Sequence, residues 1–162
     1  MIDSIDPESP RYTADLVLLH GAWSGPPIWG RIAAAMAQRG WRCHLVDLRA
    51  AASEVRGDAG AGWAAGARAV VATLEAPPIV VGHGAGGLVA LELATAPGLR
   101  AAIAAAPLAE GPRPLAPILE RWRLRLLRGT LQPPGSDHPV FAGLASEDAT
   151  RLAASLVAEV AA

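Results

Sequence analysis

The feature that most constrains this chain is an alternation between short apolar runs and longer segments with a helical spacing of apolar residues. Continuous apolar runs such as 15–19 and 79–81 are typical of strands buried on both faces of a parallel sheet. The segments between the runs repeat apolar residues three or four positions apart, as amphipathic helices do. We predict strands at 15–19, 41–48, 79–81 and 100–106, and helices at 28–39, 62–75 and 88–96.

Strand, helix and strand in this order form crossover units, which place parallel strands in one sheet with helices on both faces. The predicted fold class is therefore α/β, with its core over residues 15–107. Residues 1–14 are polar and contain prolines, so we expect an N-terminal extension without regular structure, and we expect a loop at 50–60. Ligands of such sheets bind at the carboxyl ends of the strands, which here are the loops after Leu19, Leu48, Val81 and Ala106.

After Pro107 the alternation stops, and residues 108–162 form a separate segment. Its first part is rich in proline, a helix is favoured at 118–128, and 129–145 is expected to be a loop. A final helix is predicted from Ser146 to Ala162, with Ser146 as its N-cap and acidic residues in its first turn. The chain thus ends on a helix where a further strand would begin, and we expect the sheet to lack C-terminal strands.

The composition excludes several classes of protein. Of the 162 residues, 52% are hydrophobic and 18% charged, which argues against a disordered chain or a coiled coil. The net charge of −1 lacks the basic excess that nucleic-acid binding requires, and the one cysteine, Cys43, has no disulfide partner. No apolar run reaches the length of about 18 residues that a membrane span needs, and Met1–Asp6 is acidic, so we expect a cytoplasmic protein.

Two loops at predicted strand ends carry motifs. The first strand is followed by His-Gly-Ala-Trp at 20–23, with Trp29 at the head of the next helix. The third strand is joined to its helix by Gly-His-Gly-Ala-Gly-Gly at 82–87. The first loop resembles the oxyanion loop of the α/β-hydrolase family, and the second resembles its nucleophile elbow, whose usual form is G-H-S-x-G-G. The resemblance runs from about Asp15 to Pro107, with a looser likeness to the family's lid over 108–162.

The resemblance implies an esterase- or lipase-like reaction, in which the elbow serine attacks an ester carbonyl and backbone N–H groups bind the oxyanion. On this chain the N–H groups of Ala85 and Ala22 would be those donors, and Gly84 stands where the serine would be. Glycine has no oxygen or sulfur for nucleophilic attack, although it adopts the strained backbone of the turn readily. We therefore expect the fold to survive and ester hydrolysis to be impaired or absent.

The resemblance also implies a ligand and the remaining catalytic groups. The ligand would be a small apolar ester or lactone, and no metal or other cofactor is implied. The family's acid and histidine follow later strands, so only Glu110 or Asp137 as the acid and His138 as the base remain as candidates. The residues expected to line the ligand site are His20, Gly21, Trp23, Trp29 and His83.

Two other functions stay open. Gly82, Gly84 and Gly87 satisfy the dinucleotide-binding pattern G-x-G-x-x-G, although the next predicted strand lacks the acidic end residue that would hold a ribose. A non-catalytic protein could instead use the retained pocket for binding. It could also use the 100–106 strand, predicted at the sheet edge, to pair with a second copy or with a partner chain.

Overall fold

A computed structural model of the chain describes residues 2–53, 59–106, 130–131, 135–137, 145–156 and 159–160. The chain divides into two compact units, Met1–Ala109 and Glu110–Ala162.

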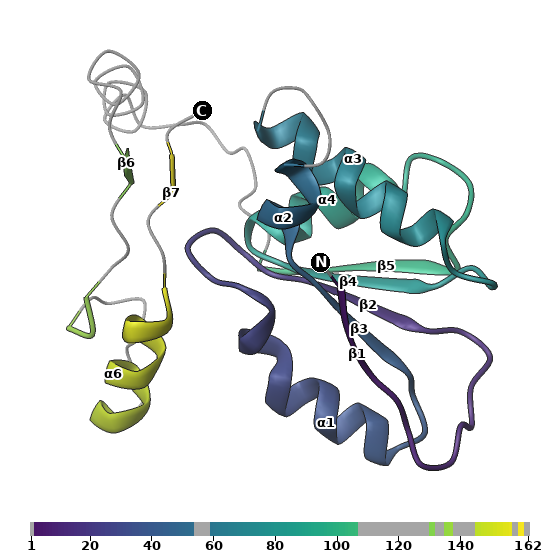
Figure 1. The fold of residues 1–162 in the computed structure, drawn as a ribbon, viewed down its shortest axis with the longest axis horizontal. Helices are drawn as coiled ribbons and strands as arrows, with labels where there is room; N and C mark the ends of the chain where they lie inside the picture. The colour runs from purple at the N-terminus through teal and green to yellow at the C-terminus, as the bar shows by residue number, and fades with distance from the viewer. Residues whose placement is uncertain are drawn as a thin grey trace. The chain divides into compact units, whose positions relative to one another are not determined.

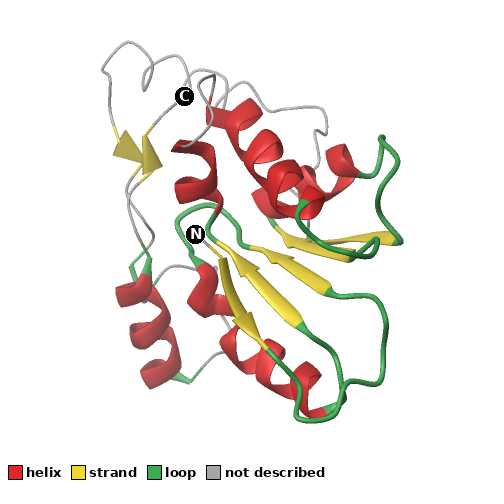
Figure 2. Cartoon of the chain, turned by 45° about the vertical axis from the view of Figure 1, so that its right-hand side comes forward, coloured by secondary structure: helices red, strands yellow, loops and turns green. Residues whose placement is uncertain are grey.

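The first unit is built on a five-stranded sheet with the strand order β1-β3-β2-β4-β5 (Figures 1 and 2). β2 pairs in parallel with both β3 and β4, and β4 pairs in parallel with β5. The predicted parallel sheet is confirmed, with strands slightly different in length from those expected. The strands are β1 (Ile2–Ile5), β2 (Leu16–Leu19), β3 (Cys43–Val46), β4 (Ile79–His83) and β5 (Ala101–Ala105).

Helices cover both faces of this sheet, as the fold class requires. Figure 1 shows α1 on one side and α2, α3 and α4 on the other. Side chains of β2 alternate between the two sides, because Leu16 and Leu18 pack on the α1 side while Val17 and Leu19 pack beneath α3 and α4. The helices are η1, a turn of 3₁₀ helix (Pro26–Trp29), α1 (Gly30–Gln38), α2 (Leu48–Ser53), α3 (Ala59–Ala72) and α4 (Ala85–Leu93).

The N-terminal residues were expected to lack regular structure, and that expectation is wrong. β1 pairs antiparallel with β3 at the edge of the sheet, with Ser4 opposite His44. Ile5 packs against the α1-side core, and Arg42 forms an ion pair with Asp6 just after the strand (2.7 Å). An edge strand can keep polar side chains in solvent, so its apolar pattern is too weak to recognise in the sequence.

The expected loop at 50–60 is also wrong, because α2 begins directly after β3. Asp47 caps this helix: its Oδ1 accepts hydrogen bonds from the N–H groups of Arg49 (3.0 Å) and Ala50 (3.1 Å). Burial alone would raise the pKa of Asp47, but these hydrogen bonds, with smaller electrostatic contributions from His20 and Arg49, outweigh it, so the pKa is lowered.

The second unit contains α6 (Ser146–Ser155) and a short antiparallel pair, β6 (Thr130–Leu131) with β7 (Glu159–Val160). Glu147 and Asp148 lie in the first turn of α6 as predicted, but the N-cap is Ala145, without a side-chain cap. The prediction of a helix to Ala162 is wrong, because Leu156 already takes an extended backbone conformation and Glu159–Val160 form β7. The predicted loop at 129–145 is corrected at Thr130–Leu131, which form β6. The predicted helix at 118–128 lies outside the described residues.

Close packing of α2 on α3 depends on Gly66. A Cβ atom at this position would stand 2.7 Å from the carbonyl carbon of Ala51, which is backbone and cannot swing aside. We expect Gly66→Ala to lower the free energy of unfolding by about 1–3 kcal/mol in urea denaturation. The matched control is Gly30→Ala in α1, where nothing lies within 4 Å and alanine should add about 0.5–1 kcal/mol. Equal effects of the two substitutions would contradict this account of the packing.

The cap at Asp47 predicts an acid-sensitive contribution to stability. Asp47→Ala should cost about 1 kcal/mol near neutral pH, whereas Asp47→Asn, which keeps an acceptor oxygen, should cost less. Because the folded pKa lies below the unfolded one, the ionised carboxylate contributes fully above about pH 4, and its contribution is lost as the pH falls through the folded pKa. Thermal denaturation of the three proteins between acidic and neutral pH would test this, and curves that stay parallel throughout would refute it.

Candidate functional site

The site is centred on the turn that joins β4 to α4. Gly84 occupies this turn with φ 54° and ψ −118°, a conformation that costs a residue with a side chain about 1–3 kcal/mol. The N–H of Gly84 donates to the carbonyl of Ala105 (3.0 Å), which ties the turn to the end of β5. A Cβ atom on Gly84 would meet only ordinary contact, with Gly21 Cα at 3.8 Å. The turn thus has the strained backbone of an elbow and space for a small side chain.

Two glycines bring the start of α4 against the sheet. A Cβ on Gly82 would lie 2.0 Å from the carbonyl oxygen of Gly86, and a Cβ on Gly86 would lie 2.4 Å from the carbonyl oxygen of His20. Backbone therefore packs directly on backbone between β4, α4 and the end of β2. The close approach that Gly82 permits is to this chain's own main chain, which accounts for this glycine without a bound dinucleotide.

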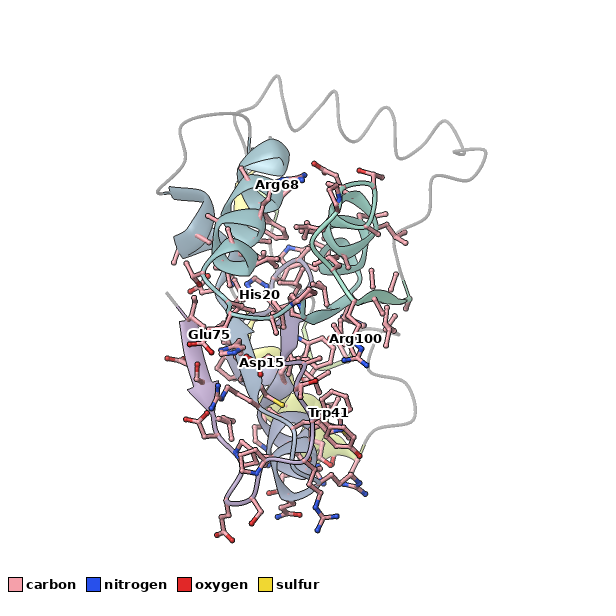
Figure 3. All side chains as sticks on the ribbon, turned by 90° about the vertical axis from the view of Figure 1, so that its right-hand side faces the viewer. Asp15, His20, Trp41, Arg68, Glu75 and Arg100 are labelled. Atoms are coloured by element: carbon pink, nitrogen blue, oxygen red, sulfur yellow. The ribbon has the colours of Figure 1, made fainter. Side chains whose placement is uncertain are left out.

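His20 holds the loop after β2 in place from inside the core. Its side chain is fully buried and lies edge-on to the ring of Trp63 in α3, with ring centroids 5.7 Å apart. The Nε2 atom accepts a hydrogen bond from the N–H of Leu48 (3.0 Å), so in the neutral ring Nδ1 carries the proton and donates to the carbonyl of Gly21 (2.8 Å). Figure 3 shows His20 between the sheet and the helix that carries Arg68. These bonds hold the loop in place from the buried ring of His20, and the expected ligand contact of this residue stays a prediction.

Further contacts fix the shape of the same loop. The buried hydroxyl of Ser24 donates to the carbonyl of Gly21 (2.9 Å), and Arg49 donates to the carbonyl of Ser24. Trp23 has φ 59°, which is uncommon for a residue with a large side chain. Gly21 lies against the other loop, since a Cβ there would be 3.1 Å from the carbonyl oxygen of His83. Sequence reasoning missed Ser24 and Arg49, although both lie close to the ends of neighbouring parallel strands.

The other predicted site residues fall into two groups. Ala22, Trp23 and Ala85 are half-buried around the turn, and His83 is exposed at the end of β4. Ala85 opens α4, and the N–H groups of a helix's first turn have no partner within the helix, so they can receive a negatively charged oxygen. Trp29, in contrast, is buried at 7% exposure in the α1-side core, where it packs with residues of β2, β3 and α1.

The candidate acid and base receive little structural support. Asp137 is exposed in a turn of the second unit, whereas Glu110 and His138 lie outside the described residues. Among the residues with described positions, no group of histidine, cysteine and acidic side chains is arranged to hold a metal ion. In the same part of the chain, no helix combines the length and apolar character needed to span a membrane.

Comparison with known proteins identifies the fold. The sequence model of the "Alpha/beta hydrolase family" matches residues 16–161. No curated protein matched the chain. Among solved structures, an extracellular alpha/beta-hydrolase from a Paenibacillus species has a TM-score of 0.70 at 16% identity, covering 90% of this chain and 66% of that one.

Two further structures show the same similarity. MenH from S. aureus has a TM-score of 0.68 at 15% identity, covering 96% of this chain and 65% of its own. A monoacylglycerol lipase from Paleococcus ferrophilus has a TM-score of 0.57 at 16% identity, covering 82% of this chain and 55% of its own. This chain thus spans between 55% and 66% of the length of these three structures, and identities this low speak for the fold alone. The family match over most of the sequence, together with the parallel sheet and the turn at Gly84, shows that this protein belongs to the alpha/beta hydrolase family.

Proposed function

We propose that this protein has the scaffold of a carboxylic ester or lactone hydrolase but is catalytically impaired, because its elbow carries no nucleophile. The observation that carries the proposal is Gly84, which has the positive φ and the neighbouring free volume of an elbow residue but no side chain. An acyl-transfer nucleophile needs an oxygen or sulfur at this point, together with a base that removes its proton. Gly84 supplies neither.

The surroundings of Gly84 support the proposal that two backbone N–H groups there could bind an oxyanion; we call these two groups the oxyanion frame. The N–H groups of Ala85, at the start of α4, and of Ala22, in the adjacent loop, are the proposed donors. His20 and Ser24 both hydrogen-bond the carbonyl of Gly21, which fixes the loop on the side of Ala22. Such a frame would favour a small apolar ester in contact with Gly21, Trp23 and His83.

The solved structures with a similar fold support the substrate class. They include a monoacylglycerol lipase and a thioesterase domain from the curacin biosynthetic pathway, whose names describe the cleavage of esters and thioesters. We also propose that residues 108–162 are the lid-like segment of this scaffold, in keeping with the division of the chain after Ala109.

Restoring a hydroxyl at the elbow tests the proposal. We expect Gly84→Ser to be modified by a fluorophosphonate at residue 84, because the two N–H donors stabilise the negative oxygen that forms during attack. The matched control is Gly98→Ser, which places the same side chain at another positive φ (114°) with nothing within 4 Å. Labelling at residue 84 should exceed labelling at residue 98 by at least about tenfold, measured by peptide mass spectrometry.

Two outcomes would contradict the proposal. Equal labelling at residues 84 and 98 would show that no oxyanion frame surrounds the elbow. Saturable hydrolysis of a p-nitrophenyl ester by the natural chain, retained in Gly84→Ala, would show that an elbow side chain is not needed for catalysis. Thermal denaturation of both serine variants should show that each remains folded, which excludes misfolding as the cause of any difference.

A second, non-catalytic function is favoured by the edge of the sheet. Among the described residues β5 pairs only with β4, so one side of β5 offers unpaired backbone groups. Ile103, at the centre of β5, is 52% exposed and lies opposite Val81, a residue that packs against the core. Uncharged exposed edges of this kind pair readily with further strands. The occupant that we propose is a second copy of this chain.

Sedimentation of the natural chain at micromolar concentration should therefore show association. Ile103→Lys should shift the population toward the monomer, because a charge on an edge strand disfavours pairing. Ile32→Lys provides the control, since Ile32 is a comparably exposed isoleucine (48%) on α1 rather than on the edge. A natural chain that sediments as a monomer, or two variants that behave alike, would refute pairing through β5.

A further inference from the structure

A serine, a histidine and an aspartate form a hydrogen-bonded chain at the end of the sheet opposite to Gly84. The hydroxyl of Ser4 on β1 lies 2.9 Å from Nδ1 of His44 on β3. The other ring nitrogen of His44, Nε2, lies 2.9 Å from Oδ2 of Asp15, the residue that precedes β2. Ser4 and His44 lie on the adjacent strands β1 and β3, and Asp15 lies directly before β2, the next strand of the sheet; Asp15 is labelled in Figure 3.

The direction of the two hydrogen bonds follows from the chemistry of the groups. A carboxylate can only accept, so Nε2 of His44 carries a proton and donates it to Asp15. In the neutral ring Nδ1 then has a lone pair, and the hydroxyl of Ser4 must be the donor to it. This is the arrangement in which a carboxylate orients a histidine and the histidine withdraws a proton from a serine, with the two ring nitrogens exchanged relative to the usual case.

The three hydrogen-bonded residues differ in burial, as proton transfer from an exposed serine to a shielded base requires. His44 has 10% of its side chain exposed and Asp15 has 22%, so both are largely shielded from water. Ser4, in contrast, is exposed on the edge strand β1. Ser4 therefore lies at the exposed end of this hydrogen-bonded chain, while its base is largely buried and held in place.

We propose that Ser4 is an acyl-acceptor site, activated by His44 as general base with Asp15 as its positioning residue. The oxygen of Ser4 attacks the carbonyl carbon of an activated acyl donor, and its proton passes to Nδ1 of His44. Collapse of the tetrahedral intermediate breaks the bond to the leaving group, which takes the proton back from His44 and departs as a thiol or phenol. The product is an ester on Ser4. This site is separate from the elbow and does not depend on the function proposed for Gly84.

The donor class follows from the exposure of Ser4. An open edge strand offers the intermediate less shielding from water than an enclosed site would, so the donor must carry a good leaving group even though His44 returns the proton. Thioesters and aryl esters meet this condition, whereas alkyl esters do not. The site is accordingly expected to be acylated once rather than to turn over rapidly.

Site-resolved acylation of the natural chain tests the proposal directly. The protein is incubated with p-nitrophenyl acetate, and the rates of acetylation at Ser4 and Ser9 are compared by peptide mass spectrometry. Ser9 is an exposed serine in the next connection, and among the described residues no hydrogen bond joins it to a histidine. We expect Ser4 to be acetylated at least about tenfold faster, because general-base assistance contributes a factor of about 10²–10⁴.

One variant separates activation from a purely structural role. His44→Gln can still accept from Ser4 and donate to Asp15, but it cannot take up a proton, so acetylation of Ser4 should fall to the rate of Ser9. Asp15→Asn should lower the rate less, and Ser4→Ala should abolish the label at that position while leaving Ser9 unchanged. Circular dichroism of each variant confirms that the fold is intact. Equal rates at Ser4 and Ser9 in the natural chain, or an unchanged rate in folded His44→Gln, would overturn the proposal.

Discussion

The structure depends on direct backbone packing between β4, the start of α4 and the end of β2. Gly82 and Gly86 make this contact possible, since a methyl group at either position would overlap main-chain atoms. The contact brings the amino end of α4 beside the loop that begins at His20. Every property proposed for the elbow follows from this juxtaposition, because a helix N-terminus and a braced loop together define where an oxyanion could lie.

The packing is independent of the residue at the tip of the turn. Gly84 touches little, and its hydrogen bond to Ala105 is made by the main chain. The loop opposite is held by His20 and Ser24 through the carbonyl of Gly21, again without any contribution from residue 84. A scaffold organised in this way can lose its nucleophile and keep its geometry, which is why membership of the family does not establish activity.

The sequence allowed the central fold to be predicted because burial on both faces leaves an unmistakable apolar run. Leu16 to Leu19 alternate between two cores, so all four must be apolar. β1 escaped prediction because its polar residues, such as Ser4, lie at an edge and are held by hydrogen bonds rather than by burial. The helix at Leu48–Ser53 was not predicted, because its start is set by the Asp47 cap and by contact with α3, and apolar periodicity reveals neither.

The site was predicted in part, for a similar reason. Gly84 and Ala85 were placed correctly on the turn because a glycine-rich strand-to-helix motif encodes local backbone geometry. The contacts of His20 were not predictable, since they depend on the N–H of Leu48, the first residue of α2, which lies 28 positions along the sequence. The hydrogen bonds from Ser4 through His44 to Asp15 likewise exist only because β1, β3 and the residue before β2 lie side by side in the sheet.

The backbone of Gly84 has a consequence for how this lineage can change over generations. A serine at that position would hold a strained backbone conformation, which costs less with glycine. Replacing serine by glycine therefore raises the free energy of unfolding, and the change is favoured where activity is not under selection. Glycine and serine codons can differ by a single base, and the surrounding main chain stays ready for either residue. Members of such a family can therefore lose or regain a serine at this position while the protein stays folded.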